Sequence, residues 1–349
     1  MPFGEIIIDW YHSHKRDLPW RRTTDPYKIW LSEIILQQTR VDQGLAYYRK
    51  FVKQYPTVQK LAKASEHDVL KLWQGLGYYS RARNLHHAAK DVVNRFKGKF
   101  PSRYDDLLSL KGVGEYTAAA IASFSFNEKK AVVDGNVFRV LARYLGISIP
   151  VNTSAAKKIF NDAAMQLMDN LPPGDFNQAI MEFGALQCKP QNPDCNHCPL
   201  QNSCFAFSNK KVNLLPLKEK KTAARKRYFN YLFIRKGRHV YMRKRTGNDI
   251  WKNMYDFPLI ETAKKISREK LLQHEDWKKY FDGKNYSLLS SGKTIKHQLT
   301  HQTIFARFFV IDTTNEIKLA GIRRINTADI QSLAVPRLIE KFLESSEQL

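Results

Sequence analysis

The sequence contains no apolar run that approaches the length of a transmembrane helix, and residues 1–10 lack a signal-peptide pattern. It also contains no internal repeat and no low-complexity tract. We therefore expect a soluble, cytoplasmic protein that makes no membrane contact. The length of 349 residues suits two domains that each bury a core.

Acidic residues are scarce relative to basic ones. The chain has 33 Asp and Glu against 57 Lys and Arg, which gives a formal net charge of +24. Such an excess attracts polyanions and strengthens their binding by counterion release, so nucleic acid is the first partner to expect. A merely soluble basic protein is the plain alternative. A membrane surface fits less well, because the basic residues are spread along the chain rather than placed beside an apolar segment.

Cysteine is scarce too, and its placement excludes a secreted domain held together by disulfides. All four cysteines lie between Cys188 and Cys204, with spacers of six, two and five residues. Four thiolates in one loop suit either a tetrahedral zinc ion or an iron–sulfur cluster. Zinc ribbons favour two close pairs set well apart, whereas this loop contains one close pair, Cys195 and Cys198.

The chain does contain helical periodicity, up to about residue 207. Asp25-Pro26 has the form of an N-cap followed by proline at the first helical position. Glycine and proline separate the periodic segments. The predicted helices are residues 27–38, 41–54, 66–72, 81–95, 104–109, 116–124, 136–145, 154–168 and 176–186.

The remaining chain has a different pattern. Residues 208–227 carry eight basic residues and one Glu, and we interpret them as a linker that either follows a phosphate backbone or is a solvated tether. Beyond them the apolar period changes to two, and Lys236-Gly237 predicts a β-hairpin. The predicted elements of this α+β domain are strands at 228–235 and 239–245, two strand-like runs within 294–310 and a helix at 336–344.

A glycine-rich turn lies between two helical stretches at residues 110–118. Gly112 and Gly114 let the backbone turn tightly and approach a ligand, while the next helix offers free N–H groups at its positive end. This combination binds a phosphate without reading a base. Any corner between two helices could use such glycines. Together with the net charge and the cysteine loop, the turn is interpreted as a helix-hairpin-helix DNA-binding element.

Two carboxylates have the surroundings that glycoside cleavage requires. Glu33 lies on a predicted helix with largely apolar neighbours, so desolvation should raise its pKa; the alternative is a Glu that points to water. Asp134 precedes another predicted helix, and one interpretation is that it only caps this helix. The other is that its ionised carboxylate also faces the cationic sugar formed when a glycosidic bond breaks. One protonated acid and one ionised carboxylate form the pair for that reaction.

The chain resembles the MutY-type adenine DNA glycosylases of the endonuclease III, or helix-hairpin-helix, superfamily over nearly its whole length. The resemblance rests on long motifs that occur in the same order. These are Pro19-Trp20-Arg21, Ser32-Glu33 through Leu36-Gln37-Gln38-Thr39, Trp73 through Gly75-Leu76-Gly77-Tyr78-Tyr79-Ser80-Arg81-Ala82-Arg83, the hairpin, Asp134-Gly135-Asn136-Val137 and the cysteine loop. The resemblance implies a mainly α-helical catalytic domain at 1–207, with a six-helix part at about 22–130 and an iron–sulfur part at about 1–21 and 131–207.

The resemblance also implies an enzyme of base-excision repair that removes adenine mispaired with 8-oxoguanine or guanine in double-stranded DNA. The enzyme would act as a monomer and would be located at the nucleoid through its binding to DNA. Glu33 would protonate N7 of a flipped-out adenine and then handle the attacking water. Asp134 would stabilise the oxocarbenium-like sugar, supported by Tyr116 and Asn136. The implied adenine pocket consists of Trp20, Arg21 and Gln178. The residues that would wedge into the duplex or touch the oxidised guanine are Gln38, Thr39, Leu76 and Tyr78. The alternative for Tyr78 is a plain core aromatic.

The six–two–five cysteine spacing is the pattern that binds a 4Fe-4S cluster in this superfamily. The implied ligands are Cys188, Cys195, Cys198 and Cys204, with zinc as the alternative. The cluster would rigidify a loop whose basic residues, including Lys189, meet DNA.

Position 116 distinguishes activities within the superfamily. Lyase members place a nucleophilic Lys there, which forms a Schiff base with the sugar, and some relatives have a Lys at position 138. This chain has Tyr116 and Phe138. Base removal without efficient strand cleavage is therefore expected.

The second domain, 228–349, resembles the Nudix-related recognition domain of these enzymes, notably from Trp251 to Pro258. The Glu-rich metal-binding helix of true Nudix hydrolases is not present in the sequence, so pyrophosphate hydrolysis is not expected. Family members read 8-oxoguanine with a Phe-Ser-His loop. The corresponding Leu299-Thr300-His301 keeps a hydroxyl and the imidazole but loses the ring. The alternative for His301 is a strand-end histidine without a ligand.

Three rival functions remain. A glycosylase for oxidised pyrimidines or thymine mismatches is disfavoured by Tyr116, by Gln37-Gln38-Thr39 and by the extra domain. A non-catalytic DNA-binding module would not explain Glu33 together with Asp134. An iron–sulfur electron carrier would explain neither the hairpin nor the net charge.

Overall fold

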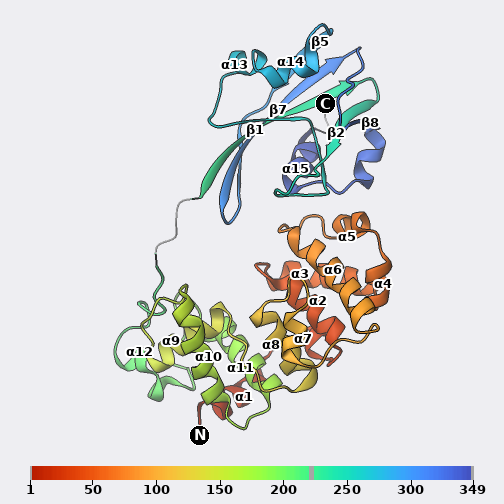
Figure 1. Cartoon of the computed structure of the whole chain (residues 1–349). Coiled ribbons are helices and arrows are strands. Elements are labelled where there is room, and N and C mark those ends of the chain that lie inside the picture. Colours follow the sequence, from red (N-terminus) through yellow and green to blue (C-terminus); the bar gives the residue numbers. More distant parts are fainter. Residues whose placement is uncertain (1, 220–223, 347–349) are drawn as a thin grey trace. The chain divides into compact units, whose positions relative to one another are not determined.

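The computed structural model describes residues 2–219 and 224–346, and the chain divides into two compact units (Figure 1). The first unit contains Met1–Lys63 and Asn84–Lys221, and the second contains Ala64–Arg83 and Thr222–Leu349. The first is helical, and the second is built on a mixed β-sheet. In the described part of the chain, no helix is long and apolar enough to cross a membrane.

The helices of the first unit agree closely with the periodicity of the sequence. Each predicted helix is present, with ends that differ by at most three residues. The helices are α1 (Phe3–His14), α2 (Pro26–Leu36), α3 (Val41–Gln54), α4 (Val58–Lys63), α6 (Ser80–Arg95), α7 (Tyr104–Leu108), α8 (Glu115–Phe126), α9 (Gly135–Leu145), α10 (Ser154–Met168), α11 (Pro173–Leu186) and α12 (Phe205–Ser208), with α5 (Glu66–Leu72) grouped in the second unit.

Helix α2 begins where the sequence predicts and is buried on almost every side. The Asp25 side chain accepts a hydrogen bond from the Tyr27 N–H at 3.0 Å, and Pro26 occupies the first helical position. A helix that is apolar around most of its circumference lies in the interior of its domain. This burial includes Glu33, so the fold takes that carboxylate out of water.

Helices α1, α9, α10 and α11 share one core. Ile7, Val140 and Phe183 are fully or almost fully buried in it, together with Phe160. Because α9 and α11 pack against each other, the beginning of α9, where Asp134 lies, is held beside the face of α11 that carries Gln178.

The second unit has one sheet with the strand order β3-β2-β1-β7-β5, and β1 and β7 are parallel. Its faces are covered by different helices: Trp277 packs with Phe309, whereas Phe342 stacks on Phe308, as expected for neighbours on a pleated strand. The strands are β1 (Arg225–Lys236), β2 (His239–Lys244), β3 (Tyr255–Asp256), β4 (Leu259–Thr262), β5 (Tyr286–Ser291), β6 (Ile295–Gln298), β7 (Gln302–Thr313) and β8 (Ile322–Asn326), and the helices are α13 (Arg268–Leu272), α14 (Glu275–Phe281) and α15 (Arg337–Ser346).

The predicted hairpin is present, with Lys236 paired to His239 across the turn. The basic segment 208–227 is not one continuous tether. Leu215 is buried in the helical core, Glu219 and Asn152 exchange hydrogen bonds, and Arg225 already belongs to β1. Residues 220–223 of the segment lie outside the described residues.

Candidate active site

A cavity of about 220 Å³ in the first unit brings together all the predicted catalytic and adenine-pocket residues, and Thr39. Its size suits one base rather than a drug-sized ligand, for which pockets of about 300–1,000 Å³ are usual. The predicted residues that line it are Trp20, Arg21, Glu33, Thr39, Tyr116, Asp134, Asn136 and Gln178. The two carboxylates therefore face one shared space.

Glu33 is held in that cavity as a weak acid. Its residue is 7% exposed, so the prediction of a desolvated carboxyl is correct and the alternative of a Glu pointing to water is wrong. Burial raises the pKa of Glu33 to about 7; a hydrogen bond from Tyr116 opposes the shift, and the charge of Asp134 adds to it. Glu33 is thus substantially protonated near neutral pH.

Asp134 is held very differently, although it faces the same cavity. It caps α9: its Oδ1 accepts from the Asn136 and Val137 N–H groups, each at 2.8 Å, and its Oδ2 accepts from Asn136 Nδ2 at 2.8 Å. Burial keeps the pKa of Asp134 above its ordinary value, although these hydrogen bonds and Arg139 oppose that shift. Three N–H donors favour the ionised form, so capping and lining the cavity are compatible in this residue.

The raised pKa of Glu33 has a consequence for stability that is independent of any reaction. The pKa of Glu33 is about 7 in the folded state against an ordinary value of 4.5. Below pH 4.5 Glu33 is protonated in both states and does not lower the free energy of unfolding. That free energy falls as the pH rises from 4.5 through 7, because Glu33 ionises first in the unfolded state. Between pH 5 and 8 the wild-type chain should lose about 2–3 kcal/mol of unfolding free energy relative to Glu33→Gln.

Thermal midpoints of the two proteins, measured at pH 5 and pH 8, check this prediction. The midpoint of Glu33→Gln should rise relative to the wild type as the pH increases. An identical pH dependence in the two proteins would show that Glu33 ionises normally in the folded state.

Glu182 is a pocket residue that the sequence analysis missed. Its carboxylate is 1% exposed and accepts from Arg16 Nη2 at 2.6 Å and from Arg21 Nη2 at 2.7 Å. Burial alone would raise the pKa of Glu182, but these hydrogen bonds lower that pKa to about 2. A signal was present, because Glu182 follows the predicted Gln178 by four residues and therefore shares its face of α11.

Arg21 is fixed by this ion pair and by its neighbours. Its Nη1 donates to Glu182 Oε1 at 2.8 Å and to the Arg16 carbonyl at 3.1 Å, and its guanidinium lies 5.6 Å from the Tyr11 ring. The Tyr11 hydroxyl in turn donates to Gln178 at 2.8 Å. The polar wall of the cavity is thus preorganised by α1 and α11.

The predicted helix-hairpin-helix element borders a second, larger cavity of about 1,050 Å³. Tyr116 lines both cavities. Gly112 has φ +80°, and a Cβ there would lie 2.6 Å from Asn84 Cβ, so glycine is required at this position. Gly114 is the N-cap of α8. The groove also contains Lys129, Lys130, Lys157 and Lys158, which makes it suitable for a phosphate backbone.

The residues predicted to wedge into the duplex are differently exposed. Gln38 has φ +55° just after α2, and Thr39 lines the smaller cavity. Leu76 is 7% exposed, whereas Tyr78 is 40% exposed. The alternative of a core aromatic at Tyr78 is therefore wrong. Within the second unit, the Tyr78 hydroxyl lies 2.8 Å from Thr300 Oγ1.

Leu299, Thr300 and His301 form the turn between β6 and β7. The Leu299 N–H donates to the Gln302 carbonyl at 2.8 Å, and the Arg225 N–H donates to the His301 carbonyl at 3.1 Å. Thr300 and His301 are exposed. The structure therefore places His301 in an exposed turn, with its backbone bound to β1.

Cys188, Cys195, Cys198 and Cys204 all line one small cavity of about 30 Å³. Burial, and then the neighbouring thiols, raise the pKa of Cys198 to about 11. Arg143 Nη1 lies 3.4 Å from Cys188 Sγ and also donates to the Lys189 carbonyl at 2.7 Å. Among the described residues, no three His, Cys, Asp or Glu side chains are arranged to hold a metal ion.

Comparison with known proteins assigns both parts of the chain. Residues 31–164 match the family described as HhH-GPD superfamily base excision DNA repair protein, and residues 230–345 match the NUDIX domain. The adenine DNA glycosylase of Buchnera aphidicola subsp. Acyrthosiphon pisum is 32% identical, covering 98% of this chain and 97% of the relative. That of Buchnera aphidicola subsp. Schizaphis graminum is 38% identical, covering 74% and 75%.

Among solved structures, a thermostable thymine-DNA glycosylase is 33% identical and superimposes with a TM-score of 0.56. The match covers 95% of that chain but 59% of this one. The similarity to the Buchnera aphidicola subsp. Acyrthosiphon pisum protein extends over nearly the whole chain, whereas the similarity to the thymine enzyme leaves a large part of it unmatched.

Proposed function

This chain belongs to the adenine DNA glycosylases of base excision repair, and from that premise we propose that it removes adenine opposite 8-oxoguanine, and opposite guanine, without cutting the DNA strand. The observation that carries the proposal is the shared cavity of Glu33 and Asp134. Glu33 has a pKa of about 7, whereas Asp134 accepts three N–H hydrogen bonds that favour its ionised form. Glycosidic bond cleavage uses one carboxyl as the acid and another as the anion.

In this mechanism Glu33 donates its proton to N7 of an adenine that has left the helix. The C1′–N9 bond breaks as the purine takes up the electron pair, and positive charge develops on the sugar. Asp134 stabilises that charge, with its carboxylate held in place by Asn136. Tyr116, whose pKa lies well above its ordinary value because of burial and the adjacent carboxyls, stays protonated and orients Glu33. Water then attacks C1′, and Glu33 takes up its proton.

The absence of an amine nucleophile supports hydrolysis without strand cleavage. Among the described residues that line the smaller cavity, none is a lysine, and position 116 carries a phenol. A phenol with a raised pKa cannot form the Schiff base that begins β-elimination.

A 4Fe-4S cluster held by the four cysteines is part of the proposal. All four thiols line one cavity of about 30 Å³, so they can bind one metal centre together. The one close pair, Cys195 and Cys198, and the six–two–five spacing support a cluster rather than a zinc ribbon. When bound, it would crosslink the loop from Cys188 to Cys204. Arg143, which donates to the carbonyls of Lys189 and Pro190, holds the loop from the other side.

The proposed mispair specificity depends on the second unit. The exposed Thr300 hydroxyl and His301 imidazole can form hydrogen bonds to the base opposite adenine, while Leu299 offers only an apolar contact. Loss of the ring found in other members should weaken stacking on that base.

Three duplexes test the proposal: adenine opposite 8-oxoguanine, adenine opposite guanine, and a thymine-glycol duplex. Adenine should be released from the first two, faster from the first. The product strand should break only after hot alkali. Release from the thymine-glycol duplex alone would establish the rival glycosylase activity, and strand breaks without alkali would contradict the strictly hydrolytic mechanism. Iron and sulfide analysis of the same protein separates the cluster from zinc.

A further inference from the structure

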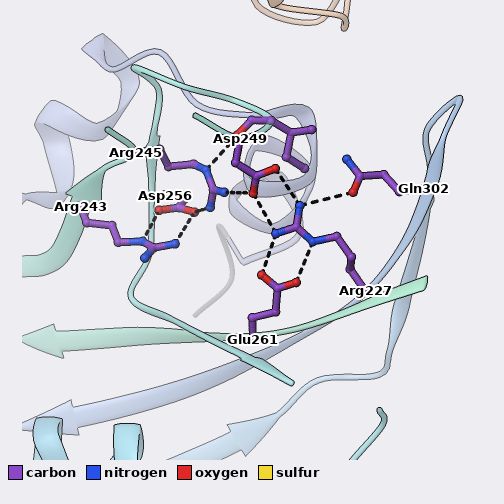
Figure 2. Close-up of polar contacts among 8 residues, drawn as sticks. Arg227, Arg243, Arg245, Asp249, Asp256, Glu261 and Gln302 are labelled. Atoms are coloured by element: carbon purple, nitrogen blue, oxygen red, sulfur yellow. Dashed lines mark hydrogen bonds and ion pairs between the residues drawn. The ribbon is translucent and has the colours of Figure 1, made fainter. Parts of the chain in front are cut away.

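An ion network in the second unit centres on Arg227, near the beginning of β1 (Figure 2). Its guanidinium forms paired hydrogen bonds with Glu261, both at 2.7 Å, and with Asp249 at 2.9 and 2.8 Å. Its Nη1 also donates to Gln302 Oε1 at 3.3 Å. These contacts use all five N–H donors that an arginine possesses, and the Arg227 side chain is only 9% exposed.

The network is balanced in charge and extends into the interior. Arg245 bridges Asp249 at 3.0 Å and Asp256 at 2.8 Å, and Arg243 also binds Asp256 at 2.8 Å. Asp256 is fully buried. Three guanidinium groups thus meet three carboxylates, counting Glu261, and the mutual constraint leaves little freedom for the groups at its edge.

The edge of this network is the base of the Leu299–His301 turn. Gln302 is the first residue of β7 and closes the turn by accepting from the Leu299 N–H. Arg225, two residues before Arg227, pairs with Gln302 in the parallel register and binds the His301 carbonyl. The network therefore holds the Gln302 side chain at the base of the turn, and the neighbouring Arg225 binds the turn's backbone.

We propose that Arg227 is a positioning residue for mispair specificity: through Gln302 it holds the Leu299–His301 turn in the geometry that distinguishes the base opposite adenine. This inference rests on the proposed function, because it assumes that the turn reads that base. Reading groups that are 1 Å too loose lose their selectivity. The excision step, which takes place in the other unit, should be unaffected.

The test compares Arg227→Lys, Gln302→Ala and a matched control, Arg235→Ala, in the full chain. Lys keeps the charge but not the planar fork. Gln302→Ala removes the link to the turn and leaves the ion pairs intact. Arg235 and Asp312 form an ion pair at 2.7 Å between the same two strands at their other end. The measurements are kcat/KM and single-turnover rates at saturating enzyme, for adenine opposite 8-oxoguanine and opposite guanine.

The preference for 8-oxoguanine in kcat/KM should fall about tenfold in Arg227→Lys and about threefold in Gln302→Ala. The saturated single-turnover rate and the behaviour of Arg235→Ala should match the wild type. An unchanged preference in Gln302→Ala, or an equal loss in Arg235→Ala, would overturn the inference, even if Arg227→Lys fails to fold. A wild-type enzyme without any preference would defeat the proposed specificity and this inference together, whereas a wild-type preference that survives both variants defeats only the inference.

Discussion

Glu33→Gln should lower the single-turnover rate of adenine release by about 10²–10⁴-fold, the range of a positioned general acid. Gln fills nearly the same volume and can still accept the hydrogen bond from Tyr116, but it has no proton to transfer. Binding of the mispaired duplex should be nearly unchanged, because the lost group acts in the chemical step. Excision at the wild-type rate with retained binding would remove Glu33 from the mechanism.

The pH dependence of the rate provides an independent check on the same residue. In the proposed mechanism the protonated form of Glu33 is the active one, and the pKa of Glu33 is about 7. Above that pH the wild-type rate should fall tenfold per unit, because the fraction of protonated Glu33 falls by that factor. The residual rate of Glu33→Gln should lack this descent. A wild-type rate that stays constant up to pH 9 would contradict a proton donated by this carboxyl.

Asp134→Asn should cost about 10²–10³-fold in the same rate, as for the removal of other electrostatic contacts to a charged transition state. Asn is as good an N-cap as Asp, so the beginning of α9 should stay folded while the negative charge is lost. The variant therefore separates the observed capping role of Asp134 from its proposed catalytic role.

Asp134→Ala completes that comparison. It removes the cap as well as the charge and should destabilise the chain by about 0.5–2 kcal/mol, with a rate loss similar to that of Asp134→Asn. Thermal midpoints and single-turnover rates of the two variants distinguish the effects. If both retain the wild-type rate, Asp134 is a cap and nothing more.

Many helices were predictable because their apolar residues recur with helical period or because they begin or end at a recognisable residue. Asp25-Pro26 and Asp134 mark two of those beginnings correctly. Helix α1 was not assigned because Ile6, Ile7 and Ile8 form a continuous apolar run, which fits a strand as well as a helix. The short strands β3, β4, β5 and β8 were missed because their pairing depends on distant partners rather than on local alternation.

The candidate site was predictable where local sequence creates the chemistry. Burial of Glu33 follows from the apolar helix around it, and the hydrogen bonds to Asp134 follow from capping. Glu182 was missed because its role depends on Arg16 and Arg21, more than 160 positions away in the sequence. Long-range ion pairs of this kind, like the Arg227 network, have no periodic signature.

Tyr116 borders both the base-sized cavity and the lysine-lined groove. In the proposed function, a flipped-out nucleotide would place its purine in the base-sized cavity and its flanking phosphates in the groove. Tyr116 would then lie between them. Movement of the DNA backbone in the groove would then also move the Tyr116 hydroxyl that orients Glu33. Binding of the DNA strand and positioning of the proton donor would therefore be coupled.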